Sequence, residues 1–118
     1  MKKLLKSFGY AFAGIWSGFR TQRNIKIHVA VALLVFILGA IVSLTRMEWM
    51  IVIIVICAVI SLELINTAIE AAVDMHGTKR HPLAKLAKDT AAGAVLVMSI
   101  GAVLIGLLIF LPKLYSLL

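Results

Sequence analysis

The chain has 118 residues, of which 63% are hydrophobic, and it carries a formal net charge of +7 at pH 7. Soluble domains rarely exceed about half apolar residues, so the composition indicates one membrane-embedded domain over residues 1–118. The positive charge does not indicate nucleic-acid binding, because the basic residues flank apolar runs instead of forming one basic face.

Residues 1–20 have the pattern of an amphipathic helix. Apolar side chains recur there every three or four residues, as at Phe8, Phe12 and Ile15, which is the spacing of one helix face. Lys2 and Lys6 lie off that stripe. An apolar stripe beside lysines is typical of a helix that lies in the membrane interface, so we expect a surface helix before the first membrane span.

Three apolar runs follow, over residues 28–44, 49–75 and 90–111. Because about 20 residues cross a bilayer core, each run predicts a transmembrane helix. A short polar turn joins the first two runs and predicts a helical hairpin, whereas a polar and basic loop, 76–89, precedes the third. Pro112 is expected to end the third run. The predicted fold is an all-α membrane protein with one amphipathic surface helix and three transmembrane helices.

The basic residues are distributed unevenly between the two ends of these runs. Ten of the 12 lysines and arginines fall on the side of the N-terminus and of loop 76–89, and the other side holds Arg46 and Lys113. Cytoplasmic segments carry the excess of Lys and Arg in membrane proteins. We therefore predict a multi-pass protein of the cell membrane with the N-terminus and loop 76–89 in the cytoplasm and the C-terminus outside.

Polar side chains form a stripe along the second half of the second run. At about 100° per residue they fall within a sector of about 100°, and the stripe is about 16 Å long. Its members are Glu63, Asn66, Thr67, Glu70 and Asp74. A charge at the depth of Glu63 costs several kcal/mol unless it faces protein, water or a partner, so cations are expected nearby. Glu48, by contrast, is interpreted as a solvated charge in the outer turn.

Lys88 and Asp89 stand where loop 76–89 meets the third run. A helix N-terminus with an adjacent lysine attracts phosphate, although an interfacial lysine beside an N-terminal carboxylate would give the same pattern. The three histidines, His28, His76 and His81, have no metal-ligand spacing, and we interpret them as interfacial residues.

The sequence contains no GxxxxGK[ST] loop, GxGxxG motif, HExxH motif or kinase catalytic loop. The residues alone therefore indicate a buried acidic site near cationic groups at the cytoplasmic face. Such a site suits either metal-assisted chemistry on an anion or the transfer of cations or protons.

Residues 63–74, ELINTAIEAAVD, resemble the signature of the bacterial integral-membrane diacylglycerol kinase family. Residues 87–89, AKD, match a second block of that family, and residues 6–10, KSFGY, with Gly14 resemble its N-terminal helix block. Residues 23–28, RNIKIH, resemble the Gram-positive branch, whose members favour undecaprenol as substrate.

The resemblance implies a kinase that phosphorylates a lipid alcohol with ATP and Mg²⁺. It also implies a homotrimer with active sites shared between subunits, which agrees with a chain too short to enclose a large site alone. Glu63 would be the catalytic base and would bind the lipid together with Asn66. Glu70 would bind the metal with Gln22, at which the family usually has glutamate. The ATP-binding positions that carry over are Tyr10, Gln22, Glu70, Asp74, Lys79, Arg80, His81, Lys88 and Asp89.

The expected function is the transfer of the γ-phosphate of ATP to undecaprenol, giving undecaprenyl phosphate. The alternative within the family is a diacylglycerol kinase that forms phosphatidic acid, and apolar lipid-facing residues do not distinguish the two substrates. The alternatives from other classes are a small ion-coupled transporter that uses Glu63 as its membrane carboxylate, and a small pore former, which would leave the acidic stripe without a purpose.

Overall fold

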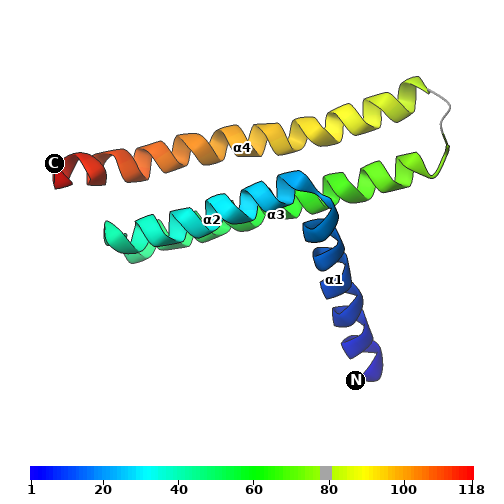
Figure 1. Ribbon diagram of the computed structural model, residues 1–118, viewed down its shortest axis with the longest axis horizontal. Helices are drawn as coiled ribbons and strands as arrows, with labels where there is room; N and C mark the ends of the chain where they lie inside the picture. The colour runs from blue at the N-terminus through cyan, green and yellow to red at the C-terminus, as the bar shows by residue number, and fades with distance from the viewer. Residues whose placement is uncertain (78–80) are drawn as a thin grey trace.

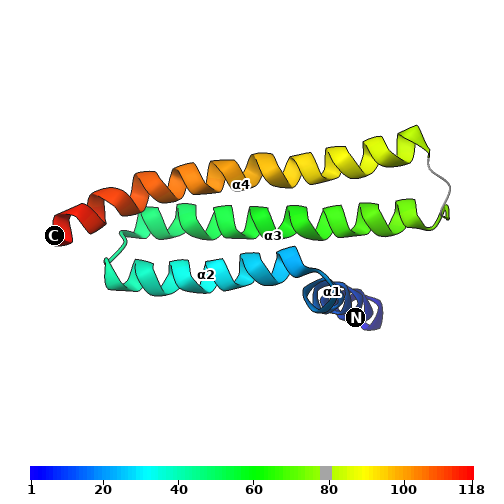
Figure 2. The same ribbon diagram turned by 45° about the horizontal axis from the view of Figure 1, so that its top comes forward.

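The computed structural model describes residues 1–77 and 81–118. Within these ranges the chain forms four α-helices, namely α1 (Lys2–Thr21), α2 (Arg23–Ile41), α3 (Arg46–Asp74) and α4 (Pro82–Leu117). Helices α2, α3 and α4 lie side by side along one direction (Figure 2), and α1 leaves the start of α2 at a steep angle (Figure 1). Each of α2, α3 and α4 is long and apolar enough to cross a membrane. The prediction of an all-α protein is therefore confirmed, as is that of three helices with the length and apolar composition of membrane spans.

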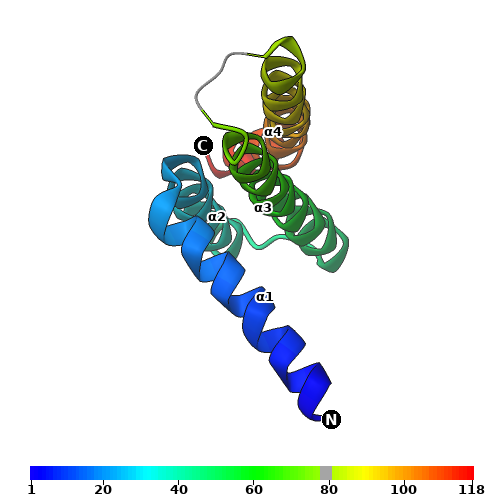
Figure 3. The same ribbon diagram turned by 90° about the vertical axis from the view of Figure 1, so that its right-hand side faces the viewer.

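Helix α1 projects away from the other three helices, as the end-on view in Figure 3 shows. Its C-terminal part meets them at Gly18, which is buried. A Cβ atom at this position would lie 2.8 Å from a methyl carbon of Leu64 on α3 and 3.1 Å from one of Ile25 on α2, so glycine permits the close approach. Leu5 and Phe12 are exposed. The placement of this helix in the membrane interface stays a prediction.

A tight turn joins α2 to α3, and Ser43 in this turn has a positive φ of 56°. Thr45 caps α3 with a capping box. Its hydroxyl accepts a hydrogen bond from the Glu48 N–H at 3.2 Å, and the Glu48 carboxylate accepts one from the Thr45 N–H at 2.9 Å. Glu48 keeps 24% of its side chain exposed, and its carboxylate also lies 3.0 Å from Lys113 Nζ of α4, a partner that the interpretation as a solvated charge did not include.

Helix α4 is longer at both ends than predicted. It begins at Pro82, so the second half of the predicted loop 76–89 is helical. Proline suits the first helical position, where an N–H would lack a partner, and His81 Nδ1 accepts a hydrogen bond from the Leu83 N–H at 3.1 Å. The expectation that Pro112 ends the helix is also wrong, because α4 continues through it. Transmembrane helices tolerate proline where local adjustments satisfy the freed carbonyl.

Helix α3 lies between α2 and α4 (Figure 2). Few side chains of the described chain are buried. A small core near the α2–α3 turn is formed by Leu44, Val52 and Phe110. Large apolar side chains elsewhere stay exposed, such as Leu34 at 65% and Leu108 at 76%. In a membrane chain such an apolar exterior faces lipid or further subunits.

Candidate active site on helix α3

The polar stripe of α3 runs from a buried end to an exposed end. Glu63 and Asn66 are buried, at 3% and 8% exposure, whereas Glu70 is half-buried and Asp74 is exposed. The Thr67 hydroxyl donates to the backbone carbonyl of Glu63 at 2.9 Å. Its hydrogen bond is therefore made within α3. The stripe therefore carries a dry carboxylate at one end and a solvent-accessible one at the other.

Glu63 is held by a histidine from the neighbouring helix. His28 Nε2 on α2 lies 3.2 Å from Glu63 Oε1. A carboxylate only accepts hydrogen bonds, so Nε2 carries the proton when Glu63 is ionised. The sequence analysis interpreted His28 as an interfacial residue and did not predict this contact. The signal that could have found the pair is the hairpin, because His28 and Glu63 lie at similar distances from the α2–α3 turn.

Asn66 connects the buried end of the stripe to Glu70. Its Nδ2 donates to Glu70 Oε1 at 3.1 Å. Within residues 1–77 and 81–118, its buried Oδ1 has no hydrogen-bond partner. A buried acceptor without a partner is costly, and here it offers a place for a donor from a ligand.

The exposed end of the stripe meets a cation from α4. Lys88 Nζ lies 2.7 Å from Asp74 Oδ1, which confirms the expectation that cations lie near these carboxylates. Asp89 instead forms an ion pair with Lys85, one turn earlier on α4. Since α4 begins at Pro82, Lys88 and Asp89 lie inside the helix and not at its N-terminus. The argument that helix-end amides assist Lys88 in binding phosphate is therefore corrected.

The other predicted nucleotide positions are separate from this cluster. Tyr10 is 75% exposed on α1, and Gln22 forms the extended junction between α1 and α2. No hydrogen bond or ion pair joins either side chain to the stripe in the part of the chain that the structure describes. His81 caps α4. The predicted ATP-binding residues Lys79 and Arg80 lie outside the described residues.

The oxygen ligands of the stripe suit magnesium. Mg²⁺ usually binds through one or two carboxylates, several waters and the phosphates of a substrate. Glu70 is half-buried on the exposed side of Asn66, and its Oε1 accepts a single hydrogen bond from Asn66. Among the described residues no group of three or more His, Cys, Asp or Glu side chains forms a metal cage. The residues thus fit a metal ion that takes one carboxylate ligand from the protein and most of its other ligands from substrate phosphates and water.

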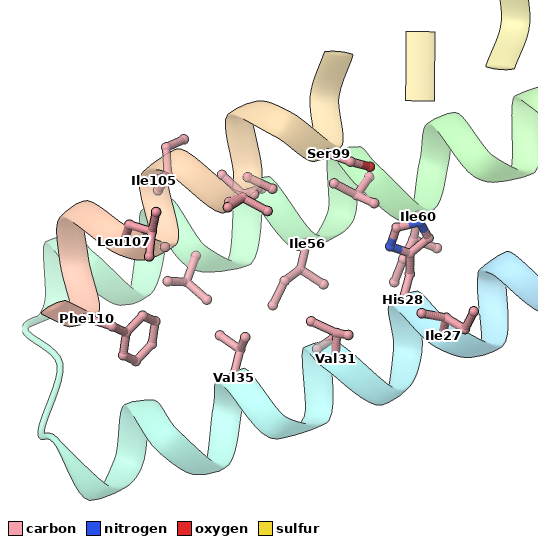
Figure 4. Close-up of a pocket in the computed structure, with 17 residues that line it drawn as sticks. Ile27, His28, Val31, Val35, Ile56, Ile60, Ser99, Ile105, Leu107 and Phe110 are labelled. Atoms are coloured by element: carbon pink, nitrogen blue, oxygen red, sulfur yellow. The ribbon is translucent and has the colours of Figure 1, made fainter. Parts of the chain in front are cut away.

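An apolar groove of about 450 Å³ lies between α2, α3 and α4. In Figure 4, His28 and Ile60 stand at one end of it and Phe110 at the other, with Val31 and Ile56 between them. The lining is almost entirely apolar, so this groove suits hydrocarbon. Its His28 end lies beside the buried end of the stripe, because His28 contacts Glu63.

The chain resembles known kinases over nearly all of its length. A family model described as "Prokaryotic diacylglycerol kinase" matches residues 9–110. The chain is 53% identical over 114 residues to the undecaprenol kinase of Bacillus subtilis (strain 168), covering 97% of this chain and 93% of that protein. It is 44% identical over 115 residues to the diacylglycerol kinase of Synechocystis sp., covering 97% and 66%. It is 35% identical over 96 residues to the diacylglycerol kinase of Helicobacter pylori (strain J99), covering 81% and 75%.

Proposed function

Because this chain belongs to the prokaryotic diacylglycerol kinase family and is a lipid kinase, we propose that its substrate is undecaprenol, which it converts with ATP to undecaprenyl phosphate. The observation that carries this choice of lipid is the 53% identity to the undecaprenol kinase of Bacillus subtilis over nearly the whole of both chains. Diacylglycerol is the second candidate, favoured by the names of the more distant relatives.

The buried carboxylate of Glu63 is the base of the proposed reaction. It accepts the proton of the lipid hydroxyl while the hydroxyl oxygen bonds to the γ-phosphorus of ATP. The bond from that phosphorus to the β,γ-bridging oxygen breaks, and ADP leaves. A carboxylate at 3% exposure is shielded from bulk water, which limits the competing hydrolysis of ATP. Phosphoryl transfer needs mainly positioning and electrostatic stabilisation; the buried base would supply the first, and the Lys88 cation beside the stripe would contribute to the second.

Neighbouring residues receive complementary roles. Asn66, with its unpartnered Oδ1 in the described chain, binds the lipid alcohol together with Glu63. Lys88 neutralises phosphate charge, since its ammonium group already lies beside Asp74 at the exposed end. The remaining proposed nucleotide contacts are Tyr10, Gln22, Asp74, Lys79, Arg80, His81 and Asp89.

Magnesium would be held by Glu70, with Gln22 as a second oxygen ligand. When bound, it would neutralise charge on the phosphate oxygens. Gln22 offers an amide oxygen without a negative charge, so this chain would depend on Glu70 and on the phosphates more than a relative with two carboxylates does.

The lipid would keep its hydrocarbon in the bilayer and bring its hydroxyl to the buried end of the stripe. The groove between α2, α3 and α4 supports this arrangement, because it is apolar along its length and reaches His28 beside Glu63. The protein would span the cell membrane with the N-terminus and residues 76–89 in the cytoplasm, in accordance with the distribution of basic residues.

The assembly would be a homotrimer in which neighbouring subunits complete each site. Two observations support this. Large apolar side chains remain exposed along α2 and α4, and Tyr10 and Gln22 make no polar contact with the stripe in the described part of one chain. Co-expression of an inactive Tyr10→Ala chain with an inactive Glu70→Gln chain should restore part of the activity. Failure of the mixture to recover any activity would contradict shared sites.

The substrate is tested with the purified protein in lipid–detergent micelles. Radiolabelled ATP and Mg²⁺ are supplied with undecaprenol, with diacylglycerol or without added lipid, and phosphate transfer into the lipid extract is measured. We expect the highest kcat/KM with undecaprenol. A clear preference for diacylglycerol would identify the second candidate. The transporter alternative would require proton-coupled flux in vesicles without ATP consumption.

A further inference from the structure

His28 occupies a position that the proposed chemistry has not used. It lies on α2, whereas the stripe lies on α3, and its Nε2 is 3.2 Å from Oε1 of Glu63. The His28 side chain is 24% exposed and that of Glu63 is 4% exposed. Part of the imidazole lines the apolar groove (Figure 4). The imidazole therefore touches both the groove and the buried carboxylate.

Among the residues described, His28 is the ionisable side chain that lies within hydrogen-bond distance of the Glu63 carboxylate. The lysine that reaches the stripe, Lys88, pairs with Asp74 at the exposed end, and the amide of Asn66 points to Glu70. A glutamate has three rotatable side-chain bonds, and the contact with His28 fixes one of its two oxygens. This contact restricts the orientations open to the other oxygen.

Resting on the function proposed above, we propose that His28 is a positioning residue, which holds Glu63 Oε1 through an Nε2–H hydrogen bond so that Oε2 faces the lipid hydroxyl. The hydroxyl proton then moves to Oε2, and His28 keeps its own proton throughout the step. A displacement of about 1 Å in a reacting group can lower a rate by about 100-fold. Loss of this hydrogen bond should therefore reduce kcat while leaving the binding of ATP and lipid nearly unchanged.

The test compares three substitutions of His28 that differ in where they place an N–H donor. His28→Leu removes the donor. His28→Gln places an amide nitrogen near the position of Nε2, whereas the shorter side chain of His28→Asn places it near Nδ1, out of reach of Glu63. We expect kcat to fall by roughly 10- to 100-fold in the Leu and Asn variants and by less than about threefold in the Gln variant, with KM for ATP and lipid within about twofold of the wild type.

Leu33→Ile is the matched control, since Leu33 lies on the same helix α2, is 59% exposed and does not line the groove. It should keep the wild-type kcat. If the Leu variant at position 28 does not fold, as judged by circular dichroism and by particle size, the comparison of the Gln and Asn variants still decides, because both retain a polar amide.

Three results would overturn the role of His28. These are a wild-type kcat in the Leu variant, an equal loss of kcat in the Gln and Leu variants, or a raised KM for the lipid with kcat unchanged. The wild-type protein in the same assay separates this inference from the proposed function. An inactive wild type with both lipids would overturn the function itself, whereas an active wild type beside a fully active Leu variant would overturn the positioning role alone.

Discussion

Replacement of Glu63 by glutamine removes the proposed base while preserving the shape of the site. The amide has the same length as the carboxylate, and its oxygen still accepts a hydrogen bond from His28 Nε2, which lies 3.2 Å from Oε1 in the native chain. General-base catalysis contributes typically 10²- to 10⁴-fold to a rate. We therefore expect Glu63→Gln to lower kcat by about that factor, which corresponds to about 2.7–5.5 kcal/mol in the activation free energy.

The same substitution should not weaken the fold. The Glu63 side chain is 4% exposed, and a buried carboxylate carries a desolvation cost of several kcal/mol that a neutral amide avoids. The free energy of unfolding, measured by denaturant titration in mixed micelles, should be unchanged or higher. Loss of activity together with a lower unfolding free energy would indicate a structural role instead.

Glu48→Gln is the control for this prediction, because it makes the same chemical change in the same helix about 22 Å away along the axis. Glu48 pairs with Lys113 near the opposite end of the helices, so its replacement should leave kcat within about twofold of the wild type. The rate is followed as phosphate transfer into the lipid extract under saturating ATP. A Glu63→Gln protein that retains near-wild-type kcat would refute the assignment of the base.

Three further predictions concern the other parts of the site and the fold. Lys88→Met breaks the ion pair with Asp74, and it should raise the KM for ATP about tenfold in steady-state assays with saturating lipid; an unchanged KM would contradict a nucleotide contact. Gln22→Glu restores the carboxylate usual in the family, and it should lower the Mg²⁺ concentration that gives half-maximal rate by about three- to tenfold; no change in a Mg²⁺ titration would place residue 22 away from the metal. Gly39→Ala adds a Cβ 2.7 Å from a tryptophan ring, and it should lower the unfolding free energy by about 1–3 kcal/mol. Gly14→Ala, with nothing within 4 Å of an added Cβ, should not destabilise the protein, and equal losses in the two variants would refute the packing argument.

The helices of this fold were predictable because hydrophobic length is a strong signal in membrane proteins. Three apolar runs gave three spans, and their order and the hairpin were correct. The helix ends were less predictable. They were placed where the apolar runs stop, but a helix can continue into polar residues. The segment from Pro82 to Lys88 contains a proline and two lysines, yet its leucine, alanine and lysine residues are good helix formers, so α4 begins there. Pro112 failed to end α4, because a membrane helix tolerates a proline that would disrupt a soluble one.

The candidate site was predictable only where it lies on one helix. Helical periodicity placed Glu63, Asn66 and Glu70 on one face, and the structure joins two of them by a hydrogen bond. Contacts between helices needed the structure. The hairpin brings His28 and Glu63 to a similar depth, but only the packed side chains show that they are in contact across a separation of 35 residues. Charge balance indicated that a cation should meet the stripe, and Lys88 was among the predicted site residues, but the packing of α4 against α3 was needed to show that Lys88 pairs with Asp74.

The order of side chains along α3 matches the order of events in a transfer from water-soluble ATP to a membrane-bound alcohol. Asp74 lies at the exposed end with its lysine partner, where an anionic nucleotide can arrive. Glu70 follows about 6 Å deeper and Glu63 about 10 Å deeper again, at about 1.5 Å per residue. Asn66 lies between the last two and donates to Glu70. In the proposed reaction, the polyphosphate of ATP would lie along this helix face with its γ-phosphate toward the buried base. A pore former or a single structural ion pair would not require this gradient from solvated to buried carboxylates, whereas a kinase that joins two phases does.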